Sequence, residues 1–204
     1  MFVTVEGIEG SGKSTLLRGL AEWLRSIGRE VVLTREPGGT PIGDAIRDLF
    51  LDRGMAITAL TEAMLVNAAR AQHVNDVIRP ELSAGKIVLS DRFVDSTIAY
   101  QGYGRGVDLQ VLAFTCSTST GGLQPDLTLL IDVPVDVSRR RIEGKGSDRL
   151  EAENDAFHQR VRAGFLEIAR ASARHHVLDG TLGTQELLAS AKAVLMPSLW
   201  AAPT

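Results

Sequence analysis

Near the start of the chain, a run of small residues ends in a lysine and a residue with a hydroxyl side chain. Together these residues could bind phosphate. Residues 7–14 read GIEGSGKS, which matches the spacing G-x-x-x-x-G-K-[ST]. Glycines let successive backbone N–H groups turn toward an anion, and the start of a following helix adds partial positive charge. A lysine in this position reaches the outer phosphates of a nucleotide, and the next hydroxyl ligates Mg²⁺. The predicted nucleotide-binding residues are Gly7, Gly10, Ser11, Gly12, Lys13, Ser14 and Thr15.

Charged residues also follow two later apolar segments. Arg35 and Glu36 come after one of them, and Asp91 and Arg92 come after another. An acidic residue at the end of a strand beside a phosphate loop typically holds Mg²⁺, directly or through water. A guanidinium binds phosphate through two parallel hydrogen bonds. These segments therefore suit a metal ligand and a second phosphate site, although each alone would equally fit a solvated loop.

Apolar, β-rich segments alternate with segments of helical spacing, and this order predicts which elements carry those residues. Expected strands are Phe2–Glu6 and residues 30–34, 87–90, 127–133 and 176–178. Expected helices are Lys13–Ser26 and residues 42–51, 59–84, 107–115, 135–141, 154–173 and 184–196. Such βαβ order predicts an α/β fold with a five-stranded parallel sheet flanked by helices. Ligands of such sheets bind at the carboxyl ends of the strands, where the candidate residues fall.

The composition limits the classes of protein to which the chain can belong. With 204 residues, 44% hydrophobic and 23% charged, the chain suits one soluble domain over residues 1–204. A net charge of −3 gives no argument for nucleic acid or membrane as a partner. The lone Cys116 excludes an intrachain disulfide, no leader pattern precedes the glycine loop, and no apolar run nears the ~20 residues of a membrane span. We expect a cytoplasmic location.

The longest specific string lies at residues 91–101, DRFVDSTIAYQ, and here the chain resembles the thymidylate kinases. That family has the pattern D-R-[FYH]-x-x-S-x-x-A-[YF]-Q in this place. Further matches are REPGGT at 35–40, AARAQ at 68–72, TGGL at 120–123, PDL at 125–127 and DRLE at 148–151. Because these blocks follow family order over about the first three quarters of the chain, they are far more specific than the phosphate loop alone.

The resemblance implies a P-loop nucleoside monophosphate kinase fold and transfer of the ATP γ-phosphoryl to dTMP with Mg²⁺. It assigns Ser14, Asp91 and Glu9 to the metal, and Arg92 and Arg47 to the dTMP phosphate. Arg70 would read the thymine edge, and Tyr100 would crowd the sugar 2′ position. The implied dTMP-binding set is Glu9, Glu36, Pro37, Arg47, Val66, Arg70, Arg92, Thr97, Tyr100 and Gln101. Homodimers are common in the family, through helices near residues 59–84.

A basic segment at about residues 139–150 falls where the family places its lid over ATP. Residues 144–147, GKGS, predict a flexible loop within it. Some family members carry a catalytic arginine in the phosphate loop, but this loop has Gly10 and Ser11 instead. The resemblance therefore assigns the charge on the transferring phosphoryl group to the lid. The candidates, in order, are Arg149, then Arg141 and Arg139, with Lys145 weaker.

One departure from the family pattern concerns the base. The family usually has a phenylalanine that stacks on thymine four residues before the base-reading arginine, and this chain has Val66 there. Valine loses stacking worth on the order of 1 kcal/mol, unless Phe93 or Tyr103 supplies the ring. A kinase for another nucleoside monophosphate is thus an alternative. A nucleotide-binding protein without catalysis is a second, opposed by the presence of Lys13 and Arg92.

Overall fold

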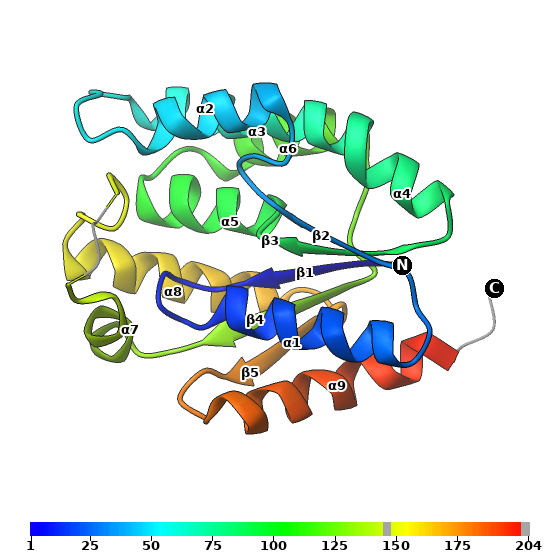
Figure 1. The fold of residues 1–204 in the computed structure, drawn as a ribbon. Helices are drawn as coiled ribbons and strands as arrows, with labels where there is room; N and C mark the ends of the chain where they lie inside the picture. Colours follow the sequence, from blue (N-terminus) through cyan, green and yellow to red (C-terminus); the bar gives the residue numbers. More distant parts are fainter. Residues whose placement is uncertain (145–147, 201–204) are drawn as a thin grey trace.

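The central sheet carries the residues that the sequence singled out. The computed structural model describes residues 1–144 and 148–200. Its strands are parallel and lie in the order β2-β3-β1-β4-β5 (Figure 1). Their bounds are β1 Phe2–Glu6, β2 Val31–Arg35, β3 Ile87–Asp91, β4 Leu127–Asp132 and β5 His175–Asp179. The expected five-stranded parallel sheet is confirmed, with strand ends shifted by at most one residue.

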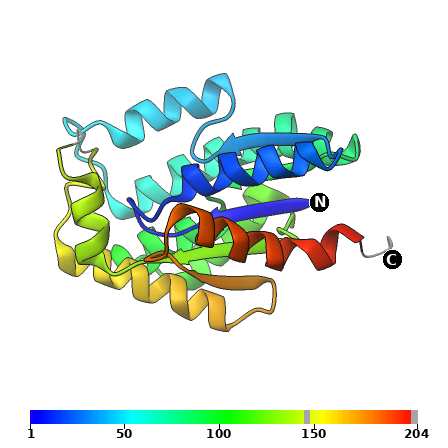
Figure 2. The same cartoon turned by 60° about the horizontal axis from the view of Figure 1, so that its bottom comes forward.

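Helices cover both faces of the sheet. They are α1 Lys13–Ser26, α2 Pro41–Leu51, α3 Ala59–His73, α4 Arg79–Ser83, α5 Val94–Thr97, α6 Leu109–Thr120, α7 Val135–Ile142, α8 Asp155–Arg170 and α9 Thr184–Trp200, with π-helices η1 Val74–Ile78 and η2 Ile98–Gly104. Helices α1 and α9 lie side by side on one face (Figures 1 and 2). Residues of α3, η1, α5, η2, α6 and α8 join the apolar clusters of the other face.

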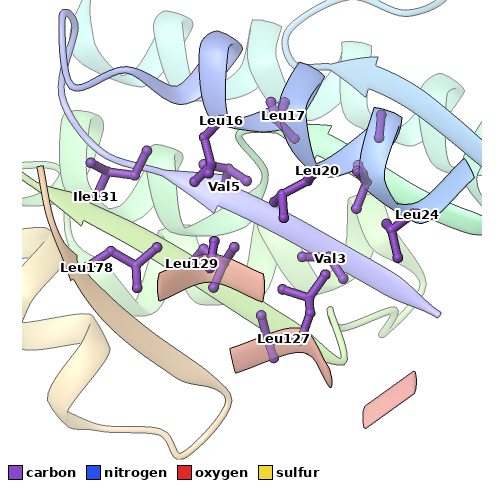
Figure 3. Close-up of a cluster of buried hydrophobic side chains, with 14 of the residues drawn as sticks. Val3, Val5, Leu16, Leu17, Leu20, Leu24, Leu127, Leu129, Ile131 and Leu178 are labelled. Carbon is purple, nitrogen blue, oxygen red and sulfur yellow. The ribbon is translucent and has the colours of Figure 1, made fainter. Parts of the chain in front are cut away.

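The apolar stripe of α1 explains how the phosphate loop is held. Leu16, Leu20 and Leu24 are buried against Val3 and Val5 of β1 in one cluster (Figure 3). Each buried leucine stabilises the fold by about 1.5–3 kcal/mol. Residues 7–12 therefore run between a fixed strand end and a fixed helix start.

Two elements differ from the sequence prediction. The helix expected over residues 59–84 is interrupted by η1, although the chain stays helical throughout. The segment Val94–Gly104 is helical as α5 and η2, which the sequence analysis did not predict. Nearly all of this segment is buried, so its sequence lacks the one-sided apolar spacing that marks a surface helix.

The ends of one predicted helix differ from those in the structure for local reasons. The helix predicted at 107–115 is α6, which starts after Asp108, whose carboxylate accepts hydrogen bonds from the backbone N–H groups of Gln110 and Val111. It ends at Gly121, which has left-handed backbone with φ 55°. The expected loop at 144–147, with Lys145, falls outside the described residues apart from Gly144. In the described part of the chain, no helix combines the length and apolar character that crossing a membrane requires.

Candidate active site

The phosphate loop is preformed around Lys13. Gly7, Gly10 and Gly12 all have positive φ, and Gly12 directly precedes α1. A Cβ on Gly7 would lie 2.5 Å from the carbonyl oxygen of Ile131, so only glycine fits there. The Lys13 ammonium donates to the carbonyl oxygens of Gly7 and Ile8, both at 3.0 Å. Burial and the neighbouring charge of Arg92 together lower the pKa of Lys13 to about 8.

The predicted metal ligands Ser14 and Asp91 meet at the loop. The Ser14 hydroxyl donates to the Asp91 carboxylate at 3.0 Å, across 77 residues of sequence. Asp91 reaches this place because β3 pairs with β1 in parallel, with Val5 opposite Asp91. A hydroxyl and a carboxylate oxygen are ligands that Mg²⁺ accepts alongside nucleotide phosphates. The residues therefore fit the ion, whereas Glu9, the third expected ligand, is engaged elsewhere.

Glu9 belongs to a cluster with Arg92 and Tyr100. The Arg92 guanidinium donates to Glu9 at 2.7 Å, and the Tyr100 hydroxyl donates to the other carboxylate oxygen at 2.6 Å. The guanidinium also lies over the Tyr100 ring, 5.0 Å from its centroid. Burial alone would raise the pKa of Glu9, but the charges of Arg92 and Lys13 and the Tyr100 hydrogen bond hold it below its usual value. This cluster is an ordered acidic and cationic wall beside the phosphate loop.

Arg70 is buried and held by several hydrogen bonds. Its Nε donates to Glu36 at 2.7 Å, and its Nη2 donates to the Thr97 hydroxyl at 2.9 Å and to the Phe93 carbonyl at 3.0 Å. The side chain is only 2% exposed. The His73 Nδ1 lies 2.9 Å from the second Glu36 oxygen. Sequence reasoning found no role for His73, although its position one helical turn after Arg70 could have indicated a shared face.

One open cavity of about 280 Å³ joins these groups. The predicted residues that line it are Glu9, Gly10, Lys13, Ser14, Glu36, Pro37, Arg47, Val66, Arg70, Asp91, Arg92, Thr97, Tyr100 and Gln101. Phe50 and Phe93 line it too, and Phe50 was not foreseen. The suggestion that Tyr103 could supply a ring beside Val66 was wrong, because Tyr103 lines a different cavity. It packs against Gly164 of α8, where a Cβ would meet its ring at 2.6 Å.

A second cavity lies along the outer side of the phosphate loop. Its lining combines Gly10, Ser11, Gly12 and Thr15 with Arg141. The loop after β5, residues 180–183, and the first turn of α9 complete it. Sequence reasoning missed that loop, because its residues carry no charge or motif. In the phosphate loop itself, the buried Ser11 hydroxyl has no hydrogen-bond partner among the described residues. The nucleoside half of a bound nucleotide would fit this cavity.

The expected lid arginines lie in different places. Arg141 points back at the phosphate loop, with its Nη1 3.4 Å from the Gly10 carbonyl oxygen. Arg139 donates to Asp155 at 3.0 Å and to the Glu151 carbonyl at 2.8 Å. Arg149 donates to the Phe50 carbonyl at 3.0 Å and forms an ion pair with buried Glu62. Of these three, only Arg141 contacts the phosphate loop.

A parallel sheet with a lysine-bearing phosphate loop, an acidic strand end and a neighbouring cavity lined by several arginines defines a P-loop nucleoside monophosphate kinase. Comparison with known proteins gives the family. The thymidylate kinase family model matches residues 5–191, and the chain belongs to that family.

Similar proteins support the assignment over nearly the whole chain. The thymidylate kinase of Geotalea uraniireducens is 44% identical, over 97% of each chain. That of Carboxydothermus hydrogenoformans is 47% identical, over 95% of this chain and 96% of its own. The crystal structure of thymidylate kinase from Ehrlichia chaffeensis has a TM-score of 0.79 and 37% identity, covering 96% of this chain and 98% of its own.

Proposed function

We propose that this protein transfers the γ-phosphoryl group of ATP to dTMP, giving dTDP and ADP as a step toward dTTP. The observation that carries the proposal is a single cavity lined by Lys13 of the phosphate loop, by Arg92 and by Arg70. A monophosphate held by Arg92 would face the loop, while its base would face Arg70. Family membership supports the choice of thymine as that base.

The donor would bind in the phosphate loop. The backbone N–H groups of Gly10, Gly12 and Ser14 would contact the phosphates, and the ammonium of Lys13 would exchange the Gly7 and Ile8 carbonyls for them. Ser14 and Asp91 would hold Mg²⁺, with Glu9 nearby. The bound ion would neutralise charge on the β- and γ-phosphates.

The acceptor would bind through charge at one end and shape at the other. Arg92 and Arg47 would hold its phosphate, and Arg47 lines the cavity with one hydrogen bond to the Pro37 carbonyl at 3.0 Å. Arg70, already aligned by Glu36 and Thr97, would read the base. Gln101, Val66 and Pro37 would enclose it. Tyr100 and Glu9 would line the sugar and favour deoxyribose.

Transfer would proceed in line, without a covalent enzyme intermediate. An oxygen of the dTMP phosphate forms the new bond to the γ-phosphorus, and the bond from that phosphorus to the ADP oxygen breaks. A phosphate oxygen is already nucleophilic, so no general base is required. Lys13, Arg92 and a lid arginine would stabilise the charge on the equatorial oxygens.

The lid of this single-domain protein would span about residues 139–150. Within it Arg141 is the strongest candidate for the transferring group, because it already contacts the Gly10 carbonyl. Arg149 would first have to leave Glu62, and Arg139 would have to leave Asp155. Closure of the lid would also exclude water and limit ATP hydrolysis.

A homodimer in the cytoplasm is the proposed working form. Exposed apolar side chains gather on the adjacent helices α3 and α6, where Leu60, Met64 and Val111 accompany Phe114, which is 73% exposed. Such a patch would be buried by a second copy. Sedimentation of wild type and Phe114→Glu would test this, with the variant expected to shift toward monomer. The free, buried thiol of Cys116 suits a reducing compartment.

ADP production with Mg·ATP and dTMP, dUMP, UMP, dCMP, dGMP or AMP tests the activity. We expect a strong preference for dTMP. Comparable turnover of another monophosphate would favour the second candidate, a kinase of different base selectivity, for which Val66 in the cavity wall is the specific observation. ATP binding without turnover of any acceptor would favour a binding protein.

A further inference from the structure

The residue proposed to hold the acceptor phosphate has an unusual backbone. Arg92 has φ 75°, and among the described residues it is the only non-glycine with positive φ. Side chains rarely adopt this region unless the surroundings fix it. Its N–H donates to the Val5 carbonyl at 3.0 Å, and its own carbonyl accepts from the Ser90 hydroxyl at 2.8 Å. Further contacts must hold the residue that follows it.

Glu6 makes those contacts from the end of β1. Its side chain is completely buried. One carboxyl oxygen accepts a hydrogen bond from the Phe93 N–H at 2.7 Å. The other accepts from the Ser96 hydroxyl at 2.5 Å. Glu6 therefore ties down the backbone on the carboxyl side of Arg92.

Ser96 extends the chain of contacts to the guanidinium. Its hydroxyl oxygen accepts from Arg92 Nη1 at 3.0 Å, while the same nitrogen donates to the Gly7 carbonyl at 3.0 Å. One carboxyl thus fixes the Arg92 backbone directly and its side chain through Ser96. Glu6 is also the residue before Gly7, so it joins the acceptor side of the cavity to the phosphate loop.

A carboxyl is a costly choice for a buried strand position. Burial, with the nearby Asp95 carboxylate, raises the pKa of Glu6 to about 8. An apolar side chain would serve the sheet without that desolvation. Within the described part of the chain, both hydrogen bonds to the Glu6 carboxyl come from the segment that follows Arg92, which points to a role in that loop.

We propose that Glu6 is a positioning residue that aims Arg92 at the acceptor phosphate. The inference rests on the proposed function for the role of Arg92. Glu6 does not contact substrate. It acts through the Phe93 N–H and the Ser96 hydroxyl, so its loss should affect the acceptor more than the donor.

Steady-state kinetics on three variants and one control test this. Glu6→Leu removes both contacts, Ser96→Ala removes only the link to the guanidinium, and Glu6→Gln keeps an acceptor for Phe93. Thr4→Val is the matched control, because Thr4 is equally buried on the same strand and its hydroxyl bonds Thr128 at 2.8 Å without touching Arg92.

We expect Glu6→Leu to raise KM for dTMP about tenfold or more, equivalent to ~1.4 kcal/mol, with KM for ATP changed less than about twofold. Ser96→Ala should raise KM for dTMP severalfold, and Glu6→Gln and Thr4→Val should stay near wild type. A purely structural role would change both KM values together or lower only the active fraction.

Two results would overturn the inference: an unchanged KM for dTMP in Ser96→Ala, or equal rises in both KM values in folded Glu6→Leu. Should Glu6→Leu fail to fold, Ser96→Ala decides alone. If wild type prefers another monophosphate, the proposed substrate is wrong, and the same comparison is made with that acceptor. If the wild type turns over no acceptor, calorimetry can measure the dissociation constants for dTMP and ATP in each variant. These constants test the same difference between acceptor and donor binding.

Discussion

Replacing Arg70 with leucine should cost much of the protein's stability as well as its proposed base recognition. The Arg70 and Glu36 side chains are 2% and 3% exposed and form a 2.7 Å ion pair. Removing the guanidinium leaves the buried Glu36 carboxylate with His73 as its remaining partner among the described residues. The Thr97 hydroxyl and the Phe93 carbonyl also lose the hydrogen bonds that Arg70 donates. Breaking one partner of a buried pair typically costs 3–5 kcal/mol, so we expect a loss of about that size.

Urea unfolding of Arg70→Leu, Glu36→Gln and the double variant would measure this. Since Glu36→Gln removes the uncompensated charge, the double variant should lose less than the sum of the single losses. Arg47→Leu is the control: it is partly exposed with one hydrogen bond to a carbonyl, and should lose about 1 kcal/mol or less. A loss below about 1 kcal/mol in Arg70→Leu, or additive losses, would refute the reasoning.

Further predictions concern pH, the lid and the base. The folded pKa of Glu6 lies above its unfolded value of 4.5, at about 8. Wild type should therefore lose stability relative to Glu6→Gln as pH rises from about 4.5 to 8, by up to ~1.4 kcal/mol per unit; urea midpoints across pH would check it, and parallel curves would contradict it. With the pKa of Lys13 lowered to about 8, ATP binding at pH 8–9 should take up protons, seen by calorimetry in buffers of different ionisation heat; Lys13→Met should abolish the uptake. Arg141→Ala should lower kcat by about 10³-fold and Arg149→Ala less; the reverse order would return the catalytic role to Arg149. Val66→Phe should lower KM for dTMP, since stacking is worth about 1 kcal/mol; an unchanged or higher KM would mean that the cavity already supplies the ring.

Local patterns predicted the parts of the site that lie close together in sequence. The phosphate loop was predictable from the spacing of glycines and lysine within residues 7–14. Asp91 was predictable from its place at the end of an apolar strand. The family resemblance added Arg70 and Tyr100, which a helix surface or a core would explain equally well from spacing alone. These residues do line one cavity.

What the sequence could not give depends on contacts between distant residues. Glu6 meets Ser96 across 90 positions, and His73 meets Glu36 across 37. Neither pair has a local pattern: parallel pairing of β1 with β3 brings Glu6 near Ser96, whereas His73 reaches Glu36 from helix α3. Phe50 was not predicted as a cavity residue, because no local pattern marks it. Arg149 was predicted to act on the lid, because the sequence does not reveal its buried partner Glu62.

The most direct test of the account follows the phosphoryl group itself. Purified protein is incubated with Mg²⁺, γ-labelled ATP and dTMP, and the labelled products are separated. We expect labelled dTDP with wild type, and labelled product reduced at least about 100-fold with Lys13→Met, which removes the cation at the transferring phosphate. Label appearing only in inorganic phosphate, or in dTDP equally with wild type and Lys13→Met, would contradict the central claim.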